Sequence, residues 1–444
     1  MSKYKFFMRN FTFFICLITS LVFVESEIHC REVPDNREGD VIRLSLLEAI
    51  EMALAKNRNL QSSAFSVKSQ EVSLGAVESD FDIKISPMGE AGVSSSRGQD
   101  SSWSVGGEVS KRFTTGIKVG LSPSLGRGEE DFNAGLNLKV EVPLMRGWGE
   151  EKSLDPVYSS RYGVSEARYS YQLSQVNLVL ETVQAVYDLA GSREEARIIG
   201  EQLVPLKEQL LVTEVKERAG VADRMDLYRS QLQIKGVQGN LSTVREQVKN
   251  GEDRLKRILA LPMEKKLLIE VPIDYEEVEI DLDLFISTAF ENRIEIRRKK
   301  EALAEQKRKN RLAEHNLQPD LRLKAGYDRL GYSDTFGDSF RFNEELWTVR
   351  LSSSTDLARS SEHAAYEQSR LAVRQEELSL EGLREQIVQE IRSRINGLQK
   401  AGEQIRINEG RVIDSTGKLR LADVKFRFGE ANNFDLTQAR SELQ

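Results

Sequence analysis

The chain has 444 residues, of which 30% are charged and 39% hydrophobic, and its formal net charge is −7. This acidic balance gives no global case for a nucleic acid as partner. The mean hydropathy of −0.43 would fit many soluble helical proteins, so composition alone excludes little else.

The N-terminus has the pattern of an export signal. Three basic residues in the first nine positions precede an apolar run at 11–24, and polar sequence follows. The run is short for a membrane helix, which needs roughly 20 apolar residues. We therefore predict a secretory signal peptide at 1–26, cleaved after Ser26, with a retained membrane anchor as the alternative. No later apolar run is long enough to span a bilayer as a helix, so residence in a membrane would require a β-barrel.

The two cysteines support the prediction of export without a disulfide. Cys16 lies in the segment that we expect to be removed, so the mature chain would keep only Cys30. A bacterial lipoprotein has a small residue before its lipidated cysteine, whereas His29 stands there, which disfavours lipidation of Cys30. An exported chain of this kind must gain its stability from packing or assembly.

Two segments alternate in the manner of β-strands, at 82–142 and 321–354, with Gly, Ser and Asn between the runs. Strands of roughly 9–11 residues have the length that a tilted barrel strand needs to cross a bilayer. The first segment predicts three or four strands where two would suffice. The additional hairpin, at 103–122, would extend either an outer loop or the wall of a barrel, and the sequence leaves both open.

Long helices separate and follow these segments. Apolar residues recur at spacings of three and four at 176–190, 203–213 and 388–398, which is typical of coiled-coil helices. Only Pro205 interrupts the region 161–261. We predict helices of about 35 residues, roughly 50 Å long.

The two halves of the chain contain one motif twice. Residues 215–222 and 226–227 recur at an offset of 209 (424 − 215), with seven identities in thirteen positions. Upstream, Asn57-Arg58 corresponds to Asn292-Arg293, and 82–85 corresponds to 320–323. Matches in the same order indicate a helix–strand–helix unit that occurs twice.

Each copy of the motif places a glycine after a helical segment and an aspartate shortly afterwards. Gly220 and Gly429 are expected to end helices, because glycine readily adopts the left-handed conformation found there. Asp226 and Asp435 are expected near the start of the returning helix, where a carboxylate favours the helix dipole. The motif predicts two capped helical hairpins, and a stronger interpretation is that both turns form one functional tip.

The second copy of the unit is shorter than the first. The first returning helix continues for 36 residues from Asp226 to Pro262 (262 − 226), whereas 9 residues follow Asp435 (444 − 435). We expect a truncated chain that does not assemble stably by itself. The predicted organisation is a signal peptide at 1–26, an N-terminal extension at 27–43, a first repeat at 44–262, a linker at 263–280 and a second repeat at 281–444.

The sequence offers no catalytic constellation. His29, His315 and His363 are isolated, with no cysteine or paired acid at metal-ligand spacing. Neither a Walker-type loop, a G-x-S-x-G motif nor a dinucleotide-binding glycine motif occurs. We predict a protein that is not an enzyme and that has no cofactor or metal.

A basic run at 297–300, followed by another at 307–309, suggests a polyanion site at first sight. Glu301 and Glu305 interleave with these residues. We therefore interpret the run as a solvated helix face instead.

Taken together, these motifs resemble the TolC-like outer-membrane efflux protein family over nearly all of the mature chain. The likeness is carried by residues 44–57, by 142–149 and by the duplicated elements at 220–227 and 429–436. It implies an α+β membrane protein with long coiled-coil-like hairpins. Strands from three chains would close one transmembrane β-barrel in the outer membrane of a Gram-negative bacterium, in contact with its lipid. The helices would form a periplasmic tunnel that meets a periplasmic adaptor and an inner-membrane pump or ABC exporter, in efflux or type I secretion.

The resemblance also implies a role for the hairpin turns. Asp435 falls where the family has an acid that narrows the periplasmic end of the pore, and Asp226 is its counterpart in the first half. A second acid often follows three residues later in the family, whereas Gln438 stands there. This departure leaves cation selectivity and the composition of the constriction open.

Two other function classes compete with the channel. A periplasmic coiled-coil adaptor or scaffold without a pore would also be helical and exported, but an adaptor would have one helical hairpin, and the duplicated unit argues against it. An enzyme on a helical scaffold lacks a candidate site. The sequence does not indicate the cargo.

Overall fold

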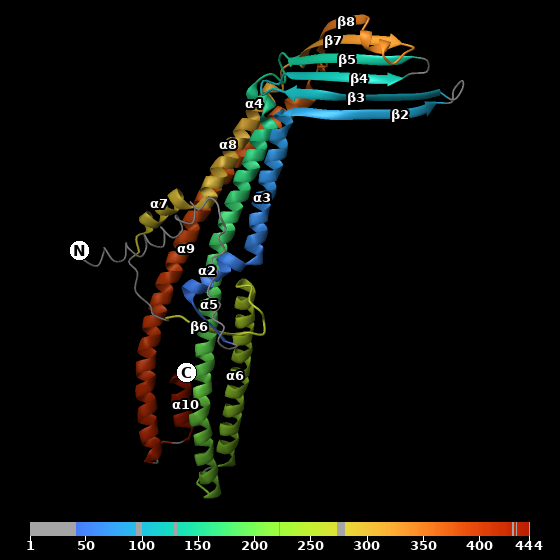
Figure 1. Cartoon of the computed structure of the whole chain (residues 1–444). Helices are drawn as coiled ribbons and strands as arrows, with labels where there is room; N and C mark the ends of the chain where they lie inside the picture. The colour runs from blue at the N-terminus through green and yellow to red at the C-terminus, as the bar shows by residue number, and fades with distance from the viewer. Residues whose placement is uncertain are drawn as a thin grey trace, which may run out of the picture.

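The computed structural model describes residues 41–94, 100–127, 131–221, 223–272, 280–428, 430–431 and 433–443. The predicted signal peptide, most of the N-terminal extension, Cys30 and Gly429 lie outside the described residues. The described chain forms an elongated column of helices with one sheet at one end (Figure 1), so the α+β class predicted from the sequence is confirmed.

The first repeat runs from a short strand through a broken helix to the sheet and back along the column. Its elements follow one another in the order that the sequence predicted. They are β1 (Val41–Ser45), α2 (Leu46–Lys56), α3 (Arg58–Glu78), the 3-10 turn η1 (Ser79–Phe81), β2 (Ile83–Ser94), β3 (Asp100–Arg112), β4 (Lys118–Arg127), β5 (Phe132–Pro143), α4 (Glu150–Ser153), α5 (Asp155–Arg218) and α6 (Arg224–Ile258).

The second repeat has the same order with fewer strands. A strand in the predicted linker precedes it and pairs in parallel with β1, which returns the chain to the start of the first repeat. The elements are β6 (Lys266–Glu270), α7 (Leu282–Asn292), α8 (Ile294–His315), β7 (Leu321–Ser333), the 3-10 turn η2 (Asp338–Arg341), β8 (Glu344–Ser353), α9 (Ser360–Arg427) and α10 (Asn433–Leu443).

In each repeat, two helices separated by a single extended residue precede the strands of the large sheet. Asn57 (φ −63°, ψ 124°) separates α2 from α3, and Arg293 (φ −66°, ψ 127°) separates α7 from α8. The sequence alignment paired Asn57 with Asn292, which is wrong by one position: Asn292 is the last residue of α7. The identity of side chains misled the alignment, because in the second repeat the equivalent backbone conformation belongs to an arginine.

The helices α5 and α9 are much longer than predicted. They contain 64 and 68 residues and are therefore about 96 Å and about 102 Å long at 1.5 Å per residue. The expected length of about 35 residues fits only α6. Pro205 lies inside α5 without ending it, so treating this proline as a boundary caused the error.

The hydrophobic core lies near the middle of the column, where α2, α5 and the end of α6 meet (Figure 1). Val186 and Leu189 of α5 pack there with Leu255 and Leu259, and all four side chains are at most 1% exposed. The β1–β6 pair packs against the same cluster. The two ends of the first repeat are thereby held near the middle of the column, between the sheet and the hairpin turns.

Six strands form one antiparallel sheet in the order β2-β3-β4-β5-β7-β8. The first half supplies four of them, in agreement with the predicted three or four. The additional hairpin pairs with its neighbours along its length, so it extends the wall of the sheet and is not an outer loop. Strands β2 and β8 are the two edges.

Candidate functional site

The turn between α5 and α6 has the geometry of a Schellman motif. Gly220 adopts a left-handed conformation (φ +74°), and its N–H donates to the Glu217 carbonyl at 2.9 Å, while the Val221 N–H donates to the Lys216 carbonyl at 2.8 Å. These bonds satisfy carbonyl groups that the end of a helix leaves free. Gly220 therefore ends the helix, as the sequence predicted.

The turn between α9 and α10 repeats this bonding at the offset of 209 residues. The Glu430 N–H donates to the Lys425 carbonyl at 2.9 Å, and the Phe428 N–H donates to the Val424 carbonyl at 3.1 Å. The equivalent bonds of the first turn join Val221 to Lys216 and Ala219 to Val215. The internal repeat seen in the sequence is thus also a repeat of backbone hydrogen bonds.

Both aspartates of the motif lie in the first turn of the returning helix. Asp226 lies in the first turn of α6 and pairs with Arg229 at 3.6 Å between Oδ1 and Nη1. Asp435 occupies the first turn of α10 and is exposed. The two hairpin turns lie at the same end of the molecule, opposite the sheet (Figure 1). Gln438 donates a hydrogen bond to the Glu442 carboxylate at 3.1 Å.

Side chains of α10 connect the second hairpin to α5. The Gln209 Nε2 donates to the Thr437 Oγ1 at 2.9 Å, and the Arg440 Nη1 donates to the Gln209 Oε1 at 2.7 Å. Between these bonds, Leu436 and Ala439 are at most 2% exposed. The two hairpins therefore form one packed end, which sequence reasoning predicted only as a possibility.

The sheet has one apolar face. Residues that pair directly across antiparallel strands lie on the same face, and one such row crosses all six strands with aliphatic and aromatic side chains alone. Every side chain of this row is exposed, from 37% to 76%. The row consists of Ile85, Val109, Leu121, Leu138, Tyr327 and Trp347.

The opposite face of the sheet is polar. The pairs Ser110–Gly120 and Asn137–Asp328 lie there, and the amide of Asn137 donates to the carboxylate of Asp328. One row of this face, which we name the charged row, crosses five strands close to the helical column. It consists of Arg112, Lys118, Glu141, Lys324 and Arg350.

A buried ion-pair network lies where the helices approach the sheet. The Arg308 guanidinium donates to the carboxylates of Asp155 and Glu305, at 2.8 and 2.7 Å, and to the Ser159 hydroxyl at 2.9 Å. The hydrogen bonds that Arg308 donates to Glu305 and Asp155 raise the pKa of its side chain, against the effect of burial, and keep it charged. The network joins α5 to α8.

The interpretation of the basic run as a solvated face is wrong for Arg308, whose side chain is 11% exposed. Arg298, Lys299 and Lys307 are more exposed, but they also pair with other helices. Arg298 pairs with Glu166 of α5, and Lys299 pairs with Glu376 of α9 at 3.0 Å. The run connects α8 to both long helices. The partners are too far away in the sequence for spacing to identify them.

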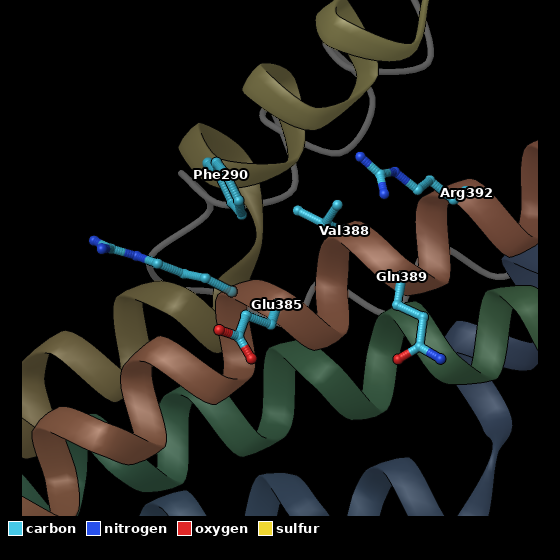
Figure 2. A pocket seen from close by; sticks show the side chains of 6 residues that line it. Phe290, Glu385, Val388, Gln389 and Arg392 are labelled. Atoms are coloured by element: carbon cyan, nitrogen blue, oxygen red, sulfur yellow. The ribbon is translucent and has the colours of Figure 1, made fainter.

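A shallow pocket of about 380 Å³ lies between α7 and α9. Figure 2 shows Phe290 of α7 above Val388 of α9, with Arg392 beside them. Among its described lining residues, Glu385 is the one acid, so the pocket offers no pair of carboxylates. The lining residues are Phe290, Arg384, Glu385, Val388, Gln389 and Arg392.

In the described part of the chain, no group of three or more His, Cys, Asp or Glu side chains is arranged to hold a metal ion. The same residues include no helix that is both long and apolar enough to cross a membrane.

Comparison with known proteins identifies relatives of this architecture. Residues 49–261 match the family described as outer membrane efflux protein, and this match confirms the resemblance to the TolC-like family. No curated protein sequence matches the chain.

Several solved structures of outer membrane proteins and transmembrane channels have the same fold. The Campylobacter jejuni CmeC outer membrane channel is 17% identical, with a TM-score of 0.69 over 90% of this chain and 80% of that one. The outer membrane protein VceC of Vibrio cholerae is 14% identical, with a TM-score of 0.68 over 90% and 89%. CusC is also 14% identical, with a TM-score of 0.67 over 90% and 86%.

Proposed function

The chain belongs, through residues 49–261, to the outer membrane efflux protein family, and from this premise we propose that it is the outer-membrane duct of an efflux or secretion system. In this proposal it works with a periplasmic adaptor and with an inner-membrane pump or ABC exporter. It conducts cargo and catalyses no reaction.

The two-faced sheet is the observation that carries this proposal. The side chains of Trp347, Val349 and Leu351 in β8 are 76%, 63% and 61% exposed. Apolar surface of this size is unfavourable in water, at about 25 cal/mol per Å², but suits contact with lipid. The polar face then suits a water-filled interior, because lipid-facing and lumen-facing residues alternate along the strands of a membrane channel.

The open edges of the sheet support assembly with further copies. Strand edges carry unpaired N–H and C=O groups, and these groups cannot remain unpaired in lipid. In the proposed trimer, β2 of one chain pairs with β8 of the next. The trimeric barrel expected from the family resemblance therefore remains part of the proposal.

The hairpin end is the proposed periplasmic tip. Asp226 and Asp435 lie at the same end of the column, in equivalent positions of the two turns. Three copies would bring six such carboxylates (2 × 3) around one axis. We assign them to the constriction of the pore and the surrounding turns to contact with the adaptor.

A periplasmic adaptor or scaffold without a pore is the second candidate from the sequence. Such a protein has no use for a six-stranded sheet with an exposed apolar face, whereas a channel requires one. The sheet therefore favours the channel.

Cell fractionation distinguishes the two functions. We expect the protein, expressed from its complete gene, in the outer-membrane fraction and as an oligomer on an unheated gel. A soluble periplasmic monomer would eliminate the channel. Purified oligomers should then produce single-channel currents in planar lipid bilayers.

A further inference from the structure

The charged row contains like charges in positions where they repel one another. Arg112 pairs directly with Lys118, and Lys324 pairs directly with Arg350. Adjacent strands lie about 4.8 Å apart, and like charges directly opposite destabilise a sheet. Folding stability therefore does not account for this arrangement of residues.

The acid within the row does not neutralise these cations. Glu141 lies between Lys118 and Lys324, but its carboxylate accepts a hydrogen bond from the Arg322 guanidinium at 2.9 Å. Arg322 also pairs with Asp320 at 2.8 Å. Among the described residues, no carboxylate forms an ion pair with Lys118, Lys324 or Arg350, and all three side chains are exposed.

A further lysine extends the positive charge one row toward the outer end of the sheet. Lys139 lies on the same face and pairs directly with Gly120 and Gly326. These glycines have no side chain, and Thr348 Oγ1 lies 2.8 Å from the position of a Cβ at Gly326. The Glu108 Oε1 lies 3.2 Å from the position of a Cβ at Gly120, but among the described residues no carboxylate lies within ion-pair distance of Lys139.

We propose that the charged row binds anions as they pass, and that it makes the sheet end of the pore favour anionic over cationic cargo. The inference rests on the proposed function, in which the polar face lines the channel. Three copies would repeat the row around the lumen at one depth. The ligands are inorganic anions and cargo that carries phosphate, sulfate or carboxylate groups, because unpaired ammonium and guanidinium groups attract these most strongly.

The aspartates of the proposed tip attract cations, whereas the charged row attracts anions. The test must therefore change the charged row and leave Asp226 and Asp435 in place. The chain offers a matched control. Lys111 lies beside Arg112 but points to the apolar face, where it pairs with Val119 and Ile83. The Lys111→Gln variant removes one positive charge at the same depth, outside the proposed lumen, and so matches each single variant of the charged row.

The experiment measures reversal potentials in planar bilayers under a KCl gradient, for the protein expressed from its complete gene. In the triple variant Lys118→Gln, Lys324→Gln, Arg350→Gln, we expect the permeability ratio of chloride to potassium to fall several-fold. The Lys111→Gln variant should keep the wild-type ratio. The difference should shrink in 1 M salt, where the Debye length is about 3 Å.

Block by inorganic pyrophosphate provides a second measurement. Added to the wild type, it should reduce the potassium current, and the triple variant should require a several-fold higher concentration. If the triple variant fails to assemble, the single variants Lys118→Gln and Arg350→Gln, each relieved of a repulsive pair, should shift both readouts in the same direction.

Unchanged selectivity and unchanged block in these variants would overturn the inference and leave the proposed channel intact. A shift in Lys111→Gln equal to that in Lys118→Gln would also overturn it, since the effect would then be one of net charge. A wild-type protein that forms no channels would overturn both, because the row would then line no pore.

Discussion

The break between α2 and α3 depends on one buried side chain. Removing this side chain tests how the middle of the column is stabilised. The Asn57 Oδ1 accepts hydrogen bonds from the N–H groups of Asn59 and Leu60 at 3.0 and 3.1 Å. Its Nδ2 donates to the Ile258 carbonyl, 201 residues away in the sequence, at 2.9 Å. Asn57 is 7% exposed, so water cannot readily replace these partners.

The expected loss of stability has two parts. Replacing an N-cap asparagine by alanine costs about 1 kcal/mol. The Ile258 carbonyl would also lose its side-chain donor in a buried position, at about 1–3 kcal/mol. We therefore expect Asn57→Ala to lower the free energy of unfolding by about 2–4 kcal/mol. Asn57→Ser keeps a capping oxygen but cannot reach Ile258, so it should lose only the second part.

The matched control is Asn292→Ala, at the end of α7. Asn292 is exposed, and among the described residues its Nδ2 bonds only within its own helix, to the Thr288 carbonyl at 2.9 Å. A surface change of this kind usually stays within about 0.5 kcal/mol. Denaturant unfolding followed by circular dichroism would compare the variants, and hydrogen exchange at the amides of 59 and 60 would report the cap directly. The reasoning is refuted if Asn57→Ala and Asn292→Ala unfold at the same denaturant concentration.

Three further perturbations test other parts of the structure. Gly331→Ala would place a Cβ 1.9 Å from the Ser339 carbonyl oxygen, so β7 and η2 must separate. We expect the free energy of unfolding to fall by about 1–3 kcal/mol and proteolysis between β7 and β8 to become faster. Unchanged proteolysis would contradict this. Asp435→Asn should reduce block of the channel by divalent cations, measured in planar bilayers, and an unchanged block would remove this residue from the proposed constriction. The hydrogen bond from Arg293 lowers the pKa of Glu390, so its contribution is present above the ordinary carboxyl pKa of about 4.3 and is lost as the pH falls through the lowered value. Because both side chains are partly exposed, the loss should stay below about 1 kcal/mol. The linkage would be contradicted if the difference in the free energy of unfolding between the wild type and a Glu390→Gln variant were the same at pH 7 and pH 3.

Local patterns in the sequence predicted the elements and their order. Period-two alternation identified both groups of strands, because each strand has one polar and one apolar face. The duplicated glycine identified both helix ends, because the left-handed residue of a Schellman motif is a backbone requirement that the sequence records directly at Gly220. The repeat then predicted that the two halves share one plan.

Long-range contacts were not predictable from these patterns. The Arg308 network joins residues 153 positions apart, and a basic run has the same spacing whether it faces solvent or other helices. The partner of Asn57 depends on where α6 ends, which its own sequence neighbours do not specify. The placement of the additional hairpin depended on the pairing of β3 with β2 and β4, a property of the assembled sheet.

The four strands of the first repeat and the two of the second have a consequence for how such a sheet changes width. Both α3 and α5 leave the sheet on the side of the helical column, so an insertion between them must return the chain to that side. A whole hairpin is the smallest insertion that does so, because a single added strand would leave the next helix at the end of the sheet opposite the helical column. Each added hairpin contributes about 10 Å to the perimeter of the wall, from two strands at about 4.8 Å each. In the proposed channel, the bore can thus change in steps while the helical column keeps its number of helices.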